Sequence, residues 1–177
     1  MRDYCFTSER LGFRSWEDAD IEFLNYLNSN IEVMRYFPKM PSSQNNKAFI
    51  KRMQELYREK GYCYFLVEEL ESGNPIGFIG LADQNYESDF TPAVDIGWSI
   101  FPGFWGNGYA TEGALRCLEY ARDLNLTEVI SVAPKINEPS IAVMRKIGLR
   151  KVYEFNHPLL KDTPRLLTCV LYKTDSL

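Results

Sequence analysis

The sequence predicts a mixed α/β fold, of the α+β type, formed by a single domain over residues 1–177. About six to seven segments have the apolar or alternating character of strands, and about four have helical periodicity. They follow the order β-αα-βββ-α-β-α-ββ, which is not the repeating βαβ pattern of a parallel sheet. No internal repeat, low-complexity segment or linker divides the 177 residues, of which 45% are apolar, so we expect one core.

The N-terminal third predicts one strand and two amphipathic helices. Apolar residues recur at steps of three between Ile21 and Leu27, which is typical of a helix buried on one side. Ser42 suits the cap of a second helix, and Gly61 suits its end. The expected elements are a strand at 6–13, a helix at 18–28 that starts near Ser15 and Asp18, a short piece at 31–36 and a helix at 45–59.

The remaining sequence predicts a block of strands and then alternating helices and strands. Residues 62–69 and 76–81 form the expected hairpin, and a polar loop at 83–91 leads to a strand at 93–101. Small residues on one face of the next helix suggest close packing on a sheet. The later elements are a helix at 109–124, a strand at 129–133, a helix at 139–147 and strands at 149–155 and 166–172.

Charge and composition exclude several classes of protein. The net charge of −4 argues against a general nucleic-acid-binding protein, which would carry a basic face. The four cysteines are widely spaced and the one histidine is His157, so we expect buried free thiols, no metal site and no catalytic triad. No stretch approaches the ~20 apolar residues that span a bilayer, and we expect a cytoplasmic protein without membrane contacts.

A glycine-rich turn between the strand at 93–101 and the helix at 109–124 is the strongest candidate site. The first backbone amides of a helix have no internal partner and favour an anion, so the turn predicts a phosphate cradle. A P-loop would have Lys-Ser or Lys-Thr where Tyr109 and Ala110 stand. A dinucleotide fingerprint would need glycine at Thr111. A tight structural turn remains the plain alternative.

The turn resembles a known motif. Pro-x-x-Trp-Gly-x-Gly-Tyr-Ala-Thr-Glu at 102–112 is similar to the pyrophosphate motif of the GNAT acetyltransferase superfamily. Most members of the superfamily have Gln or Arg at the position of Trp105. A tryptophan there resembles the branch of the Rim-type ribosomal-protein N-terminal acetyltransferases. Further blocks at 10–19, 32–38 and 137–149 resemble the same branch in the same order, so the likeness covers almost the whole chain.

The resemblance implies a central mixed, mostly antiparallel sheet that is splayed at a cleft for acetyl-CoA. In this superfamily the pantetheine arm lies between two diverging strands, and the pyrophosphate rests on backbone amides at the helix start. No metal is implied. The cofactor-binding residues implied here are Trp98, Ser99, Ile100, Trp105, Gly106, Asn107, Gly108, Tyr109, Ala110, Thr111, Asn137 and Ser140.

The implied reaction is transfer of an acetyl group to an amine by direct attack, through a tetrahedral intermediate. At pH 7, deprotonation costs about 1.1 kcal/mol for an α-amine and about 4.6 kcal/mol for a lysine. Asp95 is the candidate base, acting through water, and a solvated acid at a strand end is its alternative. Ser140 is the candidate donor to the leaving thiolate, and a second helix-capping residue is its alternative.

The acceptor is expected to be a protein N-terminus or a small-molecule amine. Met34, Tyr36 and Phe37 are expected to wall the acceptor side, and core packing would explain Met34 equally well. Specificity is expected on the two N-terminal helices, the 83–91 loop and the tail near 157–164. The rival functions are a non-catalytic acyl-CoA sensor and a nucleotide-binding module, and the chain is expected to be a monomer or homodimer.

Overall fold

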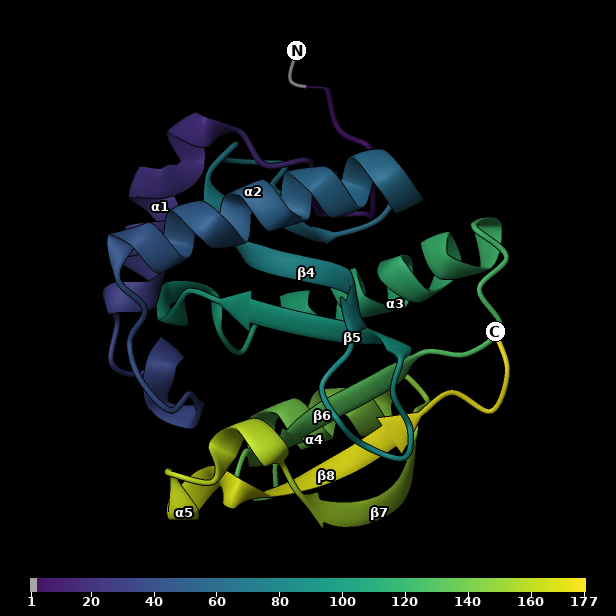
Figure 1. The fold of residues 1–177 in the computed structure, drawn as a ribbon. Helices are drawn as coiled ribbons and strands as arrows, with labels where there is room; N and C mark the ends of the chain where they lie inside the picture. The colour runs from purple at the N-terminus through teal and green to yellow at the C-terminus, as the bar shows by residue number, and fades with distance from the viewer. Residues whose placement is uncertain (1–2) are drawn as a thin grey trace.

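A computed structural model describes residues 3–177 and shows an eight-stranded sheet with helices on both faces (Figure 1). The strands follow the order β1-β2-β3-β4-β5-β6-β8-β7, and every neighbouring pair is antiparallel except β5 and β6. Their bounds are β1 Phe6–Thr7, β2 Leu11–Arg14, β3 Tyr64–Glu69, β4 Pro75–Gln84, β5 Ala93–Ile100, β6 Ile130–Pro134, β7 Arg150–Asn156 and β8 Thr168–Lys173.

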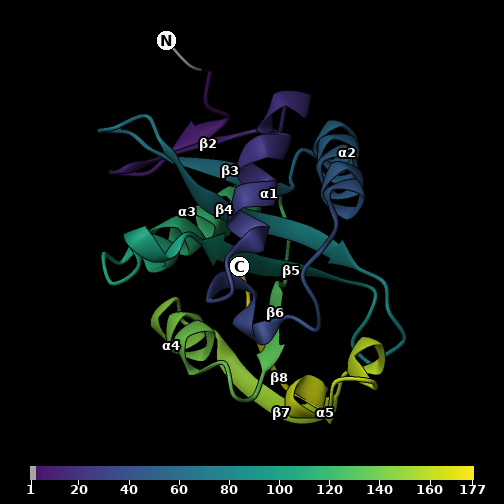
Figure 2. The same cartoon turned by 90° about the vertical axis from the view of Figure 1, so that its left-hand side faces the viewer.

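Helices cover both faces of the sheet. In Figures 1 and 2, α1 and α2 lie on one face, and α3 and α4 lie on the other. The α-helices are α1 Ile21–Ser29, α2 Ser43–Lys60, α3 Tyr109–Asp123, α4 Glu138–Lys146 and α5 Pro164–Leu167. Short 3-10 turns are η1 Asp18–Asp20, η2 Val33–Tyr36, η3 Pro102–Phe104 and η4 Pro158–Leu160. The predicted mixed, mostly antiparallel fold is therefore confirmed.

Two parts of the sequence prediction are wrong in detail. The single strand expected at 6–13 is a hairpin, because Ser8 N–H donates to the Leu11 carbonyl at 2.9 Å and turns the chain. The sheet consequently has eight strands within the described residues, not six or seven. The strand expected from 166 begins only at Thr168, because the preceding residues form α5 after a proline at its first turn.

Helix ends follow their capping residues. The predicted cap of α2 is confirmed, since Ser42 Oγ accepts from Asn45 N–H at 3.1 Å and Gly61 ends the helix with φ 77°. The helical segment before α1 begins at Asp18 as expected, but Glu17 and not Ser15 is its capping residue. There, Asp20 accepts from Glu17 N–H at 2.7 Å in a capping box, and it also pairs with Arg14.

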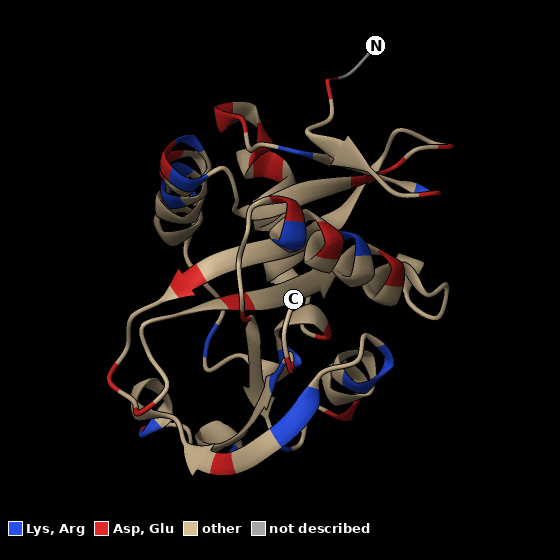
Figure 3. Ribbon diagram, turned by 90° about the vertical axis from the view of Figure 1, so that its right-hand side faces the viewer, with Lys and Arg blue, Asp and Glu red and all other residues tan. Residues whose placement is uncertain are grey.

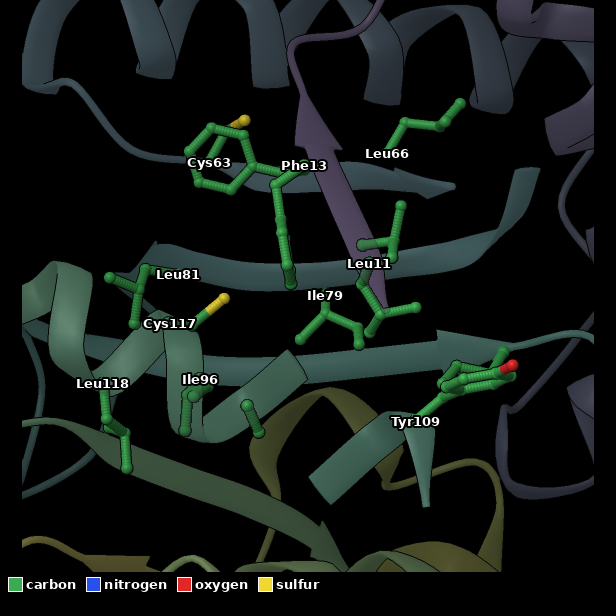
Figure 4. Packing of buried hydrophobic residues seen from close by; sticks show 14 of the residues in the cluster. Leu11, Phe13, Cys63, Leu66, Ile79, Leu81, Ile96, Tyr109, Cys117 and Leu118 are labelled. Carbon is green, nitrogen blue, oxygen red and sulfur yellow. The ribbon is translucent and has the colours of Figure 1, made fainter. Parts of the chain in front are cut away.

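The core forms where α3 lies against β4 and β5 (Figure 4). Ala114, Cys117 and Ala121 of α3 are fully buried, which confirms its predicted small-residue face. Gly113 on the same face was not predicted, and a Cβ there would lie 2.3 Å from Ile79 Cδ1. The small side chains bring the helix close to the sheet and so fix where its N-terminus lies.

The remaining sequence expectations concern thiols, charge and membranes. Three cysteines are buried free thiols as predicted, but Cys5 is exposed because it precedes the edge hairpin. Acidic and basic residues are interspersed along α2 and α3 in Figure 3. Within residues 3–177, no group of His, Cys, Asp or Glu is arranged to hold a metal ion, and no helix is long and apolar enough to cross a membrane.

Candidate functional site

The two parallel strands β5 and β6 pair at only one position and then diverge. Asp95 is in register with Ile130, and Ser131 Oγ of β6 donates to the Ile96 carbonyl at 2.9 Å. Beyond that point the strands separate, as Figure 1 shows. Because β5 leads into α3 and β6 leads into α4, the N-termini of both helices lie at the wide end of the gap. The splay implied by the sequence resemblance is therefore present.

Trp98 presents its backbone to this gap. The carbonyl of Ile96 faces β6, and that of Ile100 accepts from the Trp105 indole Nε1 at 2.6 Å. Backbone groups alternate in direction along a strand, and the β4–β5 ladder has no register shift, so the Trp98 N–H and C=O face the same side. β6 has diverged there, so this position can pair with an extended ligand.

The glycine turn forms a cradle of free backbone amides. The first intrahelical bond of α3 is from Glu112 N–H to the Gly108 carbonyl at 3.0 Å, and no side chain caps the helix. Among the described residues, none accepts a hydrogen bond from the six backbone amides at 106–111. These amides stand at the positive end of a helix of 15 residues, which makes them an anion site.

Gly106 and Gly108 give the cradle its shape. Both have φ near +80°, in the left-handed region that favours glycine. A Cβ on Gly106 would meet nothing within 4 Å, and one on Gly108 would approach only Arg10 Nη2, at 3.7 Å. The space above these residues is therefore open, and a side chain at either position would project into it. Asn107 braces the turn, because its Nδ2 donates to the Phe104 carbonyl at 3.2 Å.

The β1–β2 hairpin holds the start of α3 in place through Glu112. This carboxylate accepts from Ser8 Oγ at 2.7 Å and from Arg10 N–H at 2.8 Å, and it pairs with the Arg10 guanidinium. Burial opposes its charge, but these hydrogen bonds outweigh burial and lower the Glu112 pKa. Arg10 also donates to the Asn107 carbonyl at 3.0 Å and lies over the Tyr109 ring. Glu112 thus stabilises the geometry of the cradle.

The other residues predicted in the cradle differ in their surroundings. Tyr109 is buried, and its hydroxyl donates to Glu69. Trp105 is 50% exposed, and its indole N–H donates to the Ile100 carbonyl. This hydrogen bond fixes the geometry of the turn that follows β5. Ser99 and Ile100 are buried at the end of β5. Ala110 and Thr111 are half-buried in the first turn of α3, where their amides belong to the free set.

Asn137 and Ser140 lie across the gap, at the start of α4. Asn137 Oδ1 accepts from Ser140 N–H at 3.3 Å and caps the helix, which leaves its Nδ2 without a partner in the described chain. The half-buried Ser140 uses only its backbone in that bond. No described residue hydrogen-bonds its hydroxyl. Both side chains retain hydrogen-bonding capacity beside the gap.

Asp95 has the most informative environment among the candidate acids. Tyr64 donates its hydroxyl to Asp95 Oδ1, and Gln84 Nε2 donates to the Tyr64 hydroxyl at 3.3 Å. Burial raises the pKa of Asp95 to about 6, although Tyr64, Gln84 and Arg52 favour the charged form. A carboxyl with a pKa near neutrality can accept and release a proton at physiological pH.

A small pocket of about 190 Å³ opens next to Asp95. It brings together segments that the sequence had named separately: η2 and the residues after it, the loop after β4, and the tail at η4 (Figure 2). Of the three residues expected to wall the acceptor side, Tyr36 and Phe37 line this pocket, whereas Met34 is 7% exposed, packs in the core and does not line it.

Sequence reasoning did not single out three residues that line this pocket, Gln84, Tyr86 and His157, nor Tyr64, which bonds Asp95. A signal for Tyr64 existed in Gly80 and Gly97, because glycines inside strands mark close approaches. A Cβ on Gly97 would lie 3.2 Å from the Tyr64 ring, and one on Gly80 would lie 2.0 Å from the Cys63 carbonyl. No local pattern identified His157, whose half-buried ring packs against Tyr86 at a tilt of 41°, with centroids 4.4 Å apart.

A larger groove lies elsewhere, between η1 and α2. It has a volume of about 440 Å³ and is lined by Asp18, Lys47 and Lys51 among others. None of the residues of the cradle, the strand gap or the Asp95 pocket lines it. The smaller pocket is the one that contains Asp95.

Comparison with known proteins gives a consistent result. Residues 10–150 match the family described as "Acetyltransferase (GNAT) domain". The chain is 30% identical over 147 residues to the uncharacterized N-acetyltransferase YnaD of Bacillus subtilis (strain 168), covering 82% of each protein. It is 28% identical over 149 residues to the spermidine N(1)-acetyltransferase of Escherichia coli (strain K12), covering 81% of this chain and 75% of that protein. Its fold is similar to that of RimL, a ribosomal L7/L12 alpha-N-protein acetyltransferase solved in complex with coenzyme A, with a TM-score of 0.74, 16% identity and 97% of both chains covered.

Proposed function

This chain belongs to the GNAT acetyltransferase family, and on that premise we propose that it transfers the acetyl group of acetyl-CoA to a primary amine. The observation that carries the proposal is the row of six free backbone amides at 106–111, beside a strand whose parallel neighbour has diverged. The amides supply what a pyrophosphate requires, and the gap supplies what an extended amide-containing arm requires.

The residues present fit acetyl-CoA. Amides of the glycine turn would hold the pyrophosphate, the Trp98 backbone would pair with the pantetheine arm, and Asn137 Nδ2 would bond one of its carbonyls. When bound, acetyl-CoA supplies a thioester carbon that the amine attacks, so that a C–N bond forms, the C–S bond breaks and CoA leaves as a thiol. The chain's own residues must remove a proton from the ammonium group before the attack, and must stabilise the leaving thiolate while it takes up a proton to become the CoA thiol.

Asp95 is the proposed proton acceptor, through water. Transfer from an α-ammonium with pKa ~7.8 to a carboxylate with pKa about 6 costs about 2 kcal/mol. The same step to a carboxylate with the ordinary value of 3.8 would cost about 5 kcal/mol. A lysine ammonium, with pKa ~10.4, would still cost about 6 kcal/mol. Burial of Asp95 thus lowers the cost of deprotonation by about 3 kcal/mol for either kind of amine.

Ser140 is the proposed hydrogen-bond donor to the departing sulfur. Its hydroxyl has no partner in the described chain, and it stands in the first turn of α4 at the wide end of the gap. The helix N-terminus adds favourable electrostatics for a developing negative charge. Asn137 fixes the turn that carries Ser140, because its side chain caps the same helix.

The finer assignment to the Rim-type branch is also a proposal. The blocks at 10–19, 32–38 and 137–149 support it. The similarity to RimL at 16% identity concerns the fold alone. The similarity to a spermidine acetyltransferase supports a small-molecule amine acceptor instead. Either acceptor, a protein N-terminus or a small-molecule amine, fits a reaction in which the amine enters beside Asp95.

Two assays test the proposed function. Acetyl-CoA at 100 times its dissociation constant adds about 2.7 kcal/mol of stability, which raises the melting temperature of a protein of this size by about 5–10 °C. A panel of amines with acetyl-CoA should then release free thiol in step with N-acetylated product. No thermal shift would refute acetyl-CoA binding. A shift without thiol release from any amine would instead favour a non-catalytic sensor.

A further inference from the structure

The pocket beside Asp95 contains a hydroxyl group that lacks a partner. The Tyr86 oxygen is buried, and no described residue within reach forms a hydrogen bond with it. Tyr86 itself is held firmly, since its ring packs against His157 at 4.4 Å and against Phe90 at 5.9 Å. An orphaned buried hydroxyl costs free energy in the ligand-free protein, and a bound ligand that supplies the partner recovers it.

Tyr86 and Asp95 belong to the same small cavity. Both line the pocket, and the negative charge of Asp95 is close enough to raise the pKa of the Tyr86 hydroxyl, second only to the effect of burial. Asp95 has one carboxylate oxygen bonded by Tyr64, which leaves accepting capacity on the group. An amine nitrogen in the pocket could donate to the Tyr86 oxygen and, through the water of the proposed mechanism, to the Asp95 carboxylate.

The pocket carries a single acidic group. Among its lining residues in the described chain, Asp95 is the one carboxylate. Three acids lie close in sequence but outside the lining: Asp83 accepts from Tyr62 and pairs with Lys60, Asp89 accepts from Tyr153, and Glu87 is exposed. Burial lowers the pKa of His157, so its imidazole is neutral at pH 7 and neither attracts nor repels a cation there. One carboxylate matches one ammonium group.

The remaining walls are mostly carbon, and the volume is small. The rest of the lining consists of the apolar residues Phe37, Pro38, Val132, Ala133, Pro134 and Leu160, together with Tyr36, Gln84, His157 and Cys169. At about 190 Å³ the pocket is smaller than the ~300–1,000 Å³ typical of drug-sized ligands. Such walls offer few partners to the amides of a peptide and no second carboxylate to the further ammonium groups of a polyamine.

We infer that the acceptor is a small primary monoamine with an apolar or aromatic body, and that its nitrogen is held by the Tyr86 hydroxyl and, through that water, by the Asp95 carboxylate. This inference rests on the proposed acetyltransferase function and names the substrate class of the same site. Tyr86 is a specificity-determining residue in this account, and Tyr36, Phe37 and His157 shape the space for the carbon body of the acceptor.

The test compares three acceptors and two variants. Thiol release is measured with 2-phenylethylamine, with spermidine and with a short peptide bearing a free N-terminus. We expect kcat/KM for 2-phenylethylamine to exceed the other two at least tenfold. Tyr86→Phe should lower that kcat/KM about tenfold, mainly through KM, without changing the thermal shift caused by acetyl-CoA. Tyr153 belongs to the same aromatic cluster, and its hydroxyl donates to Asp89. Tyr153→Phe removes this hydroxyl and should keep the wild-type kcat/KM.

The outcomes separate the inference from the proposed function. A preference for spermidine or for the peptide would overturn the inference while leaving acetyl transfer intact. Unchanged kinetics in a folded Tyr86→Phe variant would overturn the role of the hydroxyl. An equal loss in Tyr153→Phe would show a general effect of the aromatic cluster and would also overturn it. No thiol release with any amine would instead contradict the proposed function itself.

Discussion

Replacing Asp95 by asparagine should stabilise the folded protein at neutral pH. Burial raises the Asp95 pKa from 3.8 to about 6, so the charged carboxylate is held in the folded state at a cost. A shift of about two units corresponds to at most about 3 kcal/mol. Partial exposure to the pocket and the retained hydrogen bond from Tyr64 reduce this, and we expect a gain of about 1–2 kcal/mol, or roughly 2–8 °C in melting temperature.

The pH dependence gives this prediction its sign. The folded pKa lies above the unfolded pKa, so the folded state binds more protons between pH 3.8 and about 6, and the wild type loses stability as the pH rises through that range. Above it the cost is constant, and below it the cost vanishes. The advantage of Asp95→Asn in urea unfolding should therefore be full at pH 7.5 and absent near pH 3.8.

A neighbouring acid supplies the control. Asp83→Asn, on the adjoining strand, removes a carboxylate that accepts from Tyr62 at 2.6 Å and pairs with Lys60, so it should lower stability instead. Turnover by Asp95→Asn should fall about 100-fold, as expected for loss of a general base. Equal or lower stability of Asp95→Asn at pH 7.5, or a gain that does not change with pH, would refute the claim that burial raises the Asp95 pKa.

Two further substitutions test the walls of the cofactor site. Ser140→Ala should lower kcat about 10- to 100-fold while the thermal shift with acetyl-CoA stays unchanged; equal turnover would remove Ser140 from the mechanism. Glu112→Gln weakens the hydrogen bonds that tie the β1–β2 hairpin to α3. It should therefore lower the free energy of unfolding by about 1–2 kcal/mol in urea titrations and weaken acetyl-CoA binding. A variant that keeps both the stability and the affinity of the wild type would contradict a bracing role for Glu112.

Local sequence signals predicted much of the fold. Ser42 and Gly61 gave the ends of α2, because capping depends on residues only three or four positions apart. The small face of α3 and the strand-turn-helix around Gly108 were found in the same way. The assignment of residues 1–177 to a single domain stays a prediction.

The pocket beside Asp95 could not be predicted, because pairing between distant strands creates it. Tyr64 reaches Asp95 only because β3, β4 and β5 lie in one register, in which Tyr64 is level with Gly80 and Gly80 with Gly97. Tyr86 and His157 meet although 71 positions separate them, and neither belongs to a motif. Strand register and loop packing depend on contacts across the whole sheet, so the sequence pattern of one segment does not predict them.

The central claim is that acetyl-CoA binds to the free amides of the glycine turn, and calorimetric titration of three proteins tests it. Gly108→Glu would place a side chain and a negative charge in the cradle. Gly61→Glu is the matched control. It also substitutes a left-handed residue, with φ 77° against 81°, but it lies against Leu124 beyond the far end of α3, about 20 Å along the helix.

The account predicts that wild type and Gly61→Glu bind acetyl-CoA with equal affinity. Folded Gly108→Glu should bind at least about 100-fold more weakly, a difference of about 2.7 kcal/mol. Wild-type affinity in a folded Gly108→Glu variant would contradict the account.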